Sequence, residues 1–128
     1  MGTYTELVLK CTLKNDLPQK VDAALRYLFC DNYPTPTDLP DHAFFKTPRW
    51  EAVGKSGSYY HCPRPLYFYD GKYLFTRTDL KNYDDEIATF LDWLMPYMSC
   101  PPGKFIGWVF CEQSREPEFI HMPGDWDE

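Results

Sequence analysis

The sequence predicts an α+β fold in which two helices pack on one face of a mainly antiparallel sheet. Three observations lead to this prediction. Residues 6–14 alternate between apolar and polar side chains, segments 15–30 and 80–100 carry apolar residues at helical spacing, and Asp70-Gly71 separates two aromatic runs. The chain has 128 residues, of which 44% are hydrophobic. We therefore expect one domain, residues 1–128, with a packed core.

The first two predicted elements are a strand with one buried side and an amphipathic helix. The strand residues expected to face the core are Leu7, Leu9, Cys11 and Leu13. Val8 and Lys10 alternate with them and are expected to face outward. Asn15 and Asp16 are candidates for the N-cap of the helix that follows. The apolar positions of that helix are Leu17, Val21, Ala24, Leu25 and Leu28.

Residues 31–57 form a long Pro-rich segment. Its prolines at positions 34, 36, 40 and 48 exclude a long regular element. Its large apolar side chains are Leu39, Phe44, Phe45, Trp50 and Val53. Because these side chains need cover from water, we expect a loop that packs back onto the domain, with one helical turn near residues 49–53.

The stretch SYYHCPRPLYFYDGKYLF, residues 58–75, contains the predicted hairpin. Asp70-Gly71 favours a two-residue turn, which places Tyr69 opposite Lys72 and Phe68 opposite Tyr73. Opposed residues share a face of the sheet. One face then carries Leu66, Phe68, Tyr73 and Phe75, and we expect this apolar and aromatic set to lie beneath the helices. The other face carries Tyr67, Tyr69, Lys72 and Leu74, and we expect it to face outward.

The second helix and two further strands complete the predicted fold. The helix is expected to begin at the acidic residues 84–86 and to end near Pro96. Residues 104–112 and 118–122 then predict two strands. The order strand, helix, two strands, helix, strand follows the βαββαβ pattern of ferredoxin-like domains, with an extra C-terminal strand. Residues 123–128 are acidic and predict a loose tail.

The motifs predict no catalytic residues, no cofactor and no metal site. The five cysteines are widely spaced without a C-x-x-C pair, which indicates reduced thiols in a cytoplasmic protein. The histidines, His42, His61 and His121, lack metal-ligand spacing. His61 and Cys62 are adjacent, so in a strand they point to opposite faces and do not form a catalytic pair. No segment is long and apolar enough to predict a membrane span.

The stretch GKYLFTRT, residues 71–78, resembles the aromatic strand on which RNA-recognition motifs stack bases. This resemblance implies RNA binding, and three observations oppose it. Tyr73 and Phe75 fall on the predicted core face, the first strand offers no outward aromatic residue, and the net charge is −6. We therefore expect no direct binding of nucleic acid.

The function that the sequence favours is that of a small acidic, non-enzymatic module that binds another protein. The expected binding residues are Val8, Lys10, Tyr67, Tyr69, Lys72 and Leu74. The acidic charge would steer the module toward a basic partner, such as a nucleic-acid-handling protein. Masking a partner would suit an inhibitor, an immunity protein or a phage or plasmid accessory factor. A homodimer formed through the open sheet face or an edge strand is equally compatible with the sequence.

The alternative function is that of a small-ligand sensor or enzyme. Its pocket would lie between residues 31–57 and the sheet, lined by Trp50, Tyr59, Tyr60 and His61. A closed cavity at that place would favour the alternative. A flat, exposed aromatic patch would favour protein binding.

Overall fold

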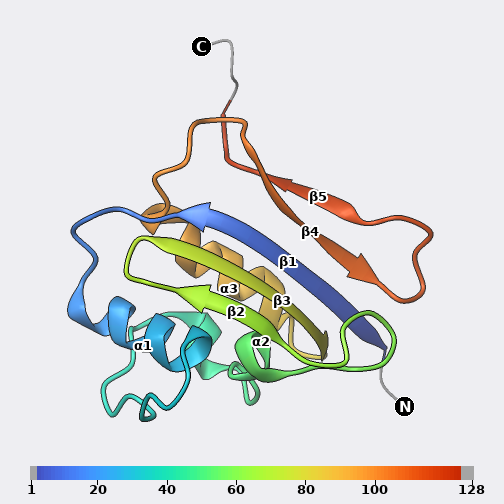
Figure 1. The fold of residues 1–128 in the computed structure, drawn as a ribbon, viewed down its shortest axis with the longest axis horizontal. Helices are drawn as coiled ribbons and strands as arrows, with labels where there is room; N and C mark the ends of the chain where they lie inside the picture. The colour runs from blue at the N-terminus through green and yellow to red at the C-terminus, as the bar shows by residue number, and fades with distance from the viewer. Residues whose placement is uncertain (1–2, 125–128) are drawn as a thin grey trace.

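The computed structural model describes residues 3–124 and shows an α+β arrangement built on one antiparallel sheet (Figure 1). The five strands are β1 (Tyr4–Thr12), β2 (Leu66–Tyr69), β3 (Tyr73–Lys81), β4 (Phe105–Cys111) and β5 (Glu118–His121). They lie in the order β2-β3-β1-β4-β5. The helices are α1 (Gln19–Phe29), α2 (Ala52–Lys55) and α3 (Glu86–Leu94). The predicted α+β class and antiparallel sheet are confirmed.

Several element boundaries differ from those that the sequence predicts. Helix α1 begins at Gln19, because the carbonyl of Pro18 accepts the first two helical hydrogen bonds. The prediction that Asn15 and Asp16 cap this helix is therefore wrong. Helix α3 ends at Leu94 and continues as the short 3-10 helix η2 (Met95–Tyr97). The acidic tail predicted for residues 123–128 falls mainly on residues 125–128, which lie outside the described part of the chain.

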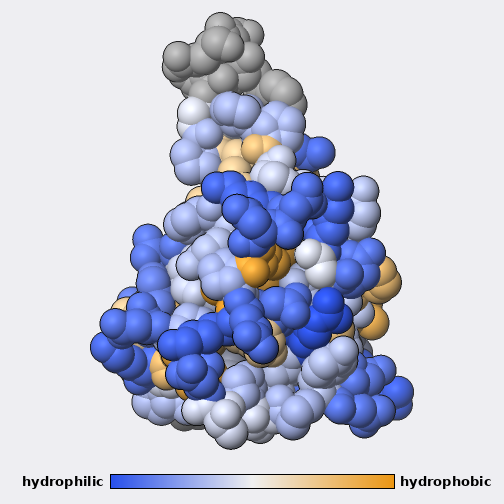
Figure 2. All heavy atoms as spheres, turned by 90° about the vertical axis from the view of Figure 1, so that its left-hand side faces the viewer, coloured by the Kyte–Doolittle hydropathy of each residue, from blue (hydrophilic) through white to orange (hydrophobic). Residues whose placement is uncertain are grey.

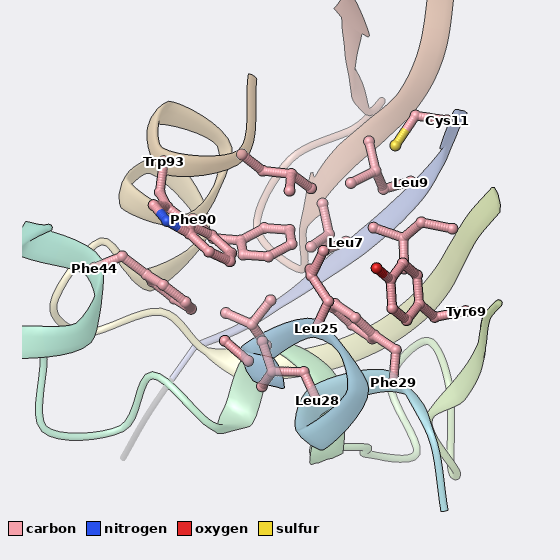
Figure 3. Close-up of a cluster of buried hydrophobic side chains, with 14 of the residues drawn as sticks. Leu7, Leu9, Cys11, Leu25, Leu28, Phe29, Phe44, Tyr69, Phe90 and Trp93 are labelled. Carbon is pink, nitrogen blue, oxygen red and sulfur yellow. The ribbon is translucent and has the colours of Figure 1, made fainter. Parts of the chain in front are cut away.

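The core lies between the sheet and the helices, and the Pro-rich segment contributes to it (Figure 3). Leu7 and Leu9 from β1 are fully buried in the same cluster as Leu25 of α1 and Phe90 of α3. The segment adds a second 3-10 helix, η1 (Ala43–Lys46). The ring of Phe44 in η1 lies 5.3 Å from that of Phe90 and stacks at 5.8 Å on that of Trp93. The long segment therefore packs back on the domain, as its apolar residues predict.

The hairpin between β2 and β3 has a longer turn than the Asp-Gly pair predicts. Tyr69 pairs with Leu74 and Phe68 pairs with Phe75, so four residues, 70–73, separate the last paired residues of β2 and β3. The Asp70 carboxylate accepts hydrogen bonds from the backbone of Lys72 at 3.0 Å and of Tyr73 at 2.8 Å. These bonds hold the wider turn, and they lower the pKa of Asp70. The predicted two-residue turn is wrong, but the two-residue shift keeps each side chain with its predicted neighbours on one face.

The assignment of these two faces is reversed in the structure. Tyr69 and Leu74 are 5% and 1% exposed, whereas Phe68 and Tyr73 are 54% and 52% exposed. The neighbouring strand explains the reversal. Leu74 lies opposite the buried Cys11 of β1, while Phe75 lies opposite the exposed Lys10. The prediction that Leu66, Phe68, Tyr73 and Phe75 lie beneath the helices is therefore wrong.

The thiol of Cys11 gives a direct test of the inward face of β1. Cys11 is 5% exposed, and burial, followed by the nearby Cys100, raises its pKa to about 12. The reactive thiolate should be about a thousandfold rarer at pH 8 than in an exposed cysteine. We expect an aromatic disulfide reagent at pH 8 to modify Cys11 only after denaturation, as followed by mass spectrometry of the labelled peptides.

The raised pKa of Cys11 also predicts how the stability of the protein changes at alkaline pH. The folded-state pKa lies above the ordinary value of 9.0. The stability contributed by the neutral buried thiol is therefore fully present below pH 9 and is lost as the pH rises toward 12. Replacing Cys11 by Ala should make the unfolding temperature less sensitive to pH in this range. Rapid modification of Cys11 in the folded protein at pH 8 would contradict the buried position.

Candidate functional site: the uncovered face of the sheet

The side of the sheet turned away from the helices carries a group of aromatic side chains. We call it the outer face, and its members include Val8, Lys10, Leu66, Phe68, Tyr73, Phe75, Phe105, Trp108 and Phe119. Strand pairing places them in rows, because directly opposed residues share a face. One row runs through Phe68, Phe75 and Lys10. Another runs from Leu66 through Val8 and Trp108 to Phe119.

Many of these apolar side chains are open to solvent. Those at least about half exposed are Leu66, Phe68, Tyr73, Phe105 and Phe119. Single exposed apolar residues are ordinary on a protein surface, but a contiguous group on one face marks a binding surface more often. Here the rows come from five adjacent strands, so the group is contiguous across the sheet.

The outer face is hollowed over β1 and the two strands that flank it, β3 and β4. The hollow has a volume of about 730 Å³. Its aromatic walls come from Phe68, Tyr73, Phe75, Phe105 and Trp108, and its two charged residues are Lys10 and Lys104. Figure 2, seen from the side of the β2–β3 turn, shows hydrophobic atoms recessed among hydrophilic ones.

Gly107 allows β4 to approach β1 closely beside the hollow. A Cβ atom at position 107 would lie only 1.9 Å from the carbonyl oxygen of Val8, so no larger residue fits without separating the two strands. The pairing of β4 with β5 is irregular between Phe105 and Gly107. This bulge re-aims side chains, and it leaves the ring of Phe105 packed edge-on against that of Phe119 at 5.4 Å.

A buried polar network closes the opposite end of the outer face. Glu6 on β1 accepts from Arg77 Nε at 2.6 Å and from Trp108 Nε1 at 2.9 Å. Glu6 is almost fully buried, and both carboxylate oxygens have donors. Its charge is therefore compensated, as a buried carboxylate requires. Glu6 also holds Trp108 in place at the edge of the hollow.

A second buried carboxylate, Asp79 on β3, fixes the loop of residues 58–62. The Nδ1 of His61 donates to Asp79 Oδ1 at 2.9 Å, and the backbone N–H of His61 donates to Oδ2 at 3.1 Å. The Ser58 hydroxyl also donates to Oδ2. The His61 ring in turn lies 5.1 Å from the ring of Phe110. These contacts anchor the loop over the end of the outer face.

The side chains of the adjacent residues His61 and Cys62 have different hydrogen-bond partners. The imidazole is bonded to Asp79, while the Cys62 thiol donates to the backbone carbonyl of Arg64 at 2.6 Å. Burial is the main cause that raises the pKa of Cys62. A thiol with a raised pKa is a poor nucleophile. Cys62 therefore has the environment of a structural cysteine.

The structure separates the residues that the sequence proposes for partner binding. Val8 and Lys10 lie on the outer face, and Lys72 is exposed in the β2–β3 turn. Tyr69 and Leu74 are buried beneath the helices, so their predicted outward position is wrong. Tyr67 is half-buried against the core, and its hydroxyl donates to Asp31 at 2.5 Å. These three side chains alternate onto the inner face because β3 pairs with the inward residues of β1.

The residues proposed for the alternative pocket also lie apart. Trp50 is 8% exposed, and its ring packs against those of Phe44, Phe45 and Tyr27 on the helical side. Tyr59 is 95% exposed, and Tyr60 and His61 lie in the loop anchored by Asp79. The groove that the Pro-rich segment does form lies against α1 and not against the sheet. Trp50 therefore lies apart from Tyr59, Tyr60 and His61, and a pocket at the predicted place stays a prediction.

Sequence reasoning missed Glu6 and Asp79 as buried charges, and it missed Phe105 and Phe119 as outward aromatics. The available signal for a buried charge was the presence of opposite charges, such as Glu6 and Arg77, on two predicted strands. Gly107 inside a strand was the signal for a bulge near Phe105.

Comparisons with known proteins leave the geometry as the basis for a functional argument. No family model, curated protein or solved structure matches the chain. Within residues 3–124, no group of three or more His, Cys, Asp or Glu side chains is arranged to hold a metal ion. None of the helices described here has the length and apolar composition needed to cross a bilayer.

Proposed function

We propose that this chain is a non-enzymatic module that binds another protein through the outer face of its sheet. One observation carries the proposal: five adjacent strands present a contiguous group of half-exposed aromatic and apolar side chains on the side that no described helix covers. Aromatic residues are enriched in the centres of protein interfaces and in their energetic hot spots. The hollow beside Trp108 offers a place for a partner side chain to enter.

The binding surface proposed here differs from the one predicted from the sequence. Val8 and Lys10 remain in it, while Tyr67, Tyr69 and Leu74 are replaced by Phe68, Tyr73, Phe75, Phe105, Trp108 and Phe119. Partner masking remains the proposed mode of action, in the cytoplasm and of the inhibitor, immunity or accessory-factor type. The strand order supports the further proposal that the fold is ferredoxin-like with one added strand at the β4 edge. No structural observation favours the small-ligand alternative at its predicted place.

Site-specific photo-crosslinking in the native host tests the proposal. A photoreactive amino acid at position 68 or 105 should capture a partner protein, because both side chains are about half exposed on the outer face. The same group at position 92 samples the exposed surface of α3 on the helical side and should not capture that partner. The captured protein is identified by mass spectrometry and then purified for binding measurements.

A double variant, Phe68→Ala with Phe105→Ala, should weaken binding of that partner about tenfold or more, as expected for truncated interface hot spots. Tyr83→Ala is the matched control, because Tyr83 is equally exposed but its ring lies under Arg49 at 4.6 Å. Both variants should keep the unfolding temperature within a few degrees of the original. Equal capture at positions 68 and 92, or unchanged binding by the double variant, would refute the outer face as the interface.

A further inference from the structure

We propose that the hollow of the outer face recognises an acidic segment of the partner protein that carries an aromatic side chain. In this arrangement the aromatic ring enters the hollow, and flanking carboxylates pair with Lys10 and Lys104. The inference rests on the proposed function, and it adds the chemistry of the partner. It reverses the charge that the net acidity of the chain predicts for a partner.

The charged residues around the hollow are both basic. The chain has 19 acidic and 13 basic residues, yet the lining of the hollow contains Lys10 and Lys104 and no acidic residue. Neither lysine forms an ion pair with any residue between positions 3 and 124, whereas Lys20 and Lys46 on the helical side pair with Asp38 and Asp41. Two unpaired ammonium groups beside an apolar hollow favour an anionic occupant.

The volume and lining of the hollow suit an aromatic side chain. A volume of about 730 Å³ falls in the range of clefts that bury a drug-sized group, which is room enough for an aromatic side chain. The lining is mainly apolar and includes five aromatic residues, so it matches an aromatic or apolar ring. The Thr12 hydroxyl in the lining already contacts Ser99 Oγ at 3.2 Å and Cys100 Sγ at 3.6 Å. Few polar groups are left to bond an occupant inside the hollow.

These features disfavour two other occupants. A nucleobase would bury ring nitrogens and amino groups with few partners, which costs free energy, and the net charge of −6 repels a phosphate backbone at long range. A second copy of this chain would bring its own Lys10 and Lys104 against the same pair in a two-fold interface. Like charges facing each other in that way disfavour a homodimer through this face.

Peptide selection on the full-length protein tests the inference. A library of random twelve-residue peptides is selected against the original protein and against the double variant Lys10→Glu, Lys104→Glu. We expect peptides with one aromatic residue flanked by at least two acidic residues to be enriched on the original protein. The charge-reversed variant should instead enrich basic residues around the aromatic one.

The best selected peptide then gives a quantitative measurement by fluorescence anisotropy. Its dissociation constant should rise at least tenfold in the charge-reversed variant and should increase with salt concentration. A second double variant, Lys20→Glu with Lys46→Glu, is the matched control, because these exposed lysines lie on the helical side. It should bind the peptide as the original protein does. Circular dichroism should show the same fold in all three proteins.

Several results would overturn the inference. These are selection of peptides without acidic residues, the same selection by both proteins, no enrichment on the original protein, or tighter binding of a ten-nucleotide oligothymidylate than of any peptide. The photo-crosslinked partner separates this inference from the proposed function. If that partner loses affinity for Phe68→Ala, Phe105→Ala but binds the charge-reversed variant normally, the proposed function stands and the acidic segment does not.

Discussion

Replacing Tyr69 by Ala should lower the free energy of unfolding by about 3 to 5 kcal/mol, whereas Phe68→Ala should lower it by less than about 1 kcal/mol. The two residues are neighbours on β2 with exposed fractions of 5% and 54%. The Tyr69 ring is packed in the core, lies 5.3 Å from the Arg26 guanidinium and donates its hydroxyl to Asp22 at 2.6 Å. Truncation removes all of these contacts and leaves a cavity.

Urea unfolding at neutral pH measures both effects. Tyr69→Phe serves as a control that keeps the ring and removes only the hydroxyl, and it should cost about 0.5 to 1.5 kcal/mol. The remainder of the Tyr69→Ala loss then belongs to the buried ring. A larger loss for Phe68→Ala than for Tyr69→Ala would restore the face assignment made from the sequence and remove the basis for the outer face.

The sequence predicts β1 correctly because its alternation is strict. The four inward residues from Leu7 to Leu13 are all apolar, and two of the three residues between them, Lys10 and Thr12, are charged or polar. The period of two then leaves one choice of buried face. The buried faces of α1 and α3 were predictable for the same reason, because their apolar residues share one side.

The buried face of the hairpin cannot be predicted in this way, because both of its faces are rich in aromatic residues. Comparing the hydrophobicity of the two sets favours the wrong one, because the set that lies inward was counted with Lys72, which is exposed in the turn, whereas the other set is entirely apolar or aromatic. The decisive information is tertiary: β3 pairs with β1 so that Leu74 meets Cys11. The face of one strand is known only after its partner and register are known.

The reversed faces of the hairpin also weaken the case against RNA binding that the sequence makes. Tyr73 and Phe75 do face outward, so one of the three observations against RNA binding no longer holds. β1 begins at Tyr4, which shares a face with Glu6 and stacks on Tyr60 at 6.1 Å, so the observation about the first strand no longer holds either. The net charge of −6 still stands. The oligothymidylate comparison described above therefore addresses a specific structural possibility.

Replacing Asp79 by Ala should be the second strongly destabilising change, with a loss of about 3 to 5 kcal/mol, because it breaks a buried charged network by removing one partner. Asp79 is fully buried, and its carboxylate accepts from the side chains of Ser58 and His61 and from the His61 backbone. Without the carboxylate, these donors lose their acceptor in a site that excludes water. The loop of residues 58–62 should then lose its anchor to β3.

A second Asp-His pair in the same protein supplies the matched control. His42 and Asp92 lie at the same distance of 2.9 Å, but the Asp92 side chain is 80% exposed. Asp92→Ala should therefore cost no more than about 1 kcal/mol, the range of exposed ion pairs. The comparison therefore sets a buried carboxylate with three donors against an exposed one whose donor is an imidazole at the same distance.

Hydrogen exchange distinguishes local from global effects of Asp79→Ala. Amides of residues 58–62 should exchange faster in this variant than in Asp92→Ala, even under conditions in which both proteins are fully folded. The backbone N–H of His61 should respond most, because its acceptor is the deleted carboxylate. Asp79→Asn should fall between the original protein and Asp79→Ala, since an amide offers one acceptor oxygen where the carboxylate offers two. Equal losses of stability for Asp79→Ala and Asp92→Ala, with unchanged exchange in the loop, would show that the buried carboxylate does not anchor it.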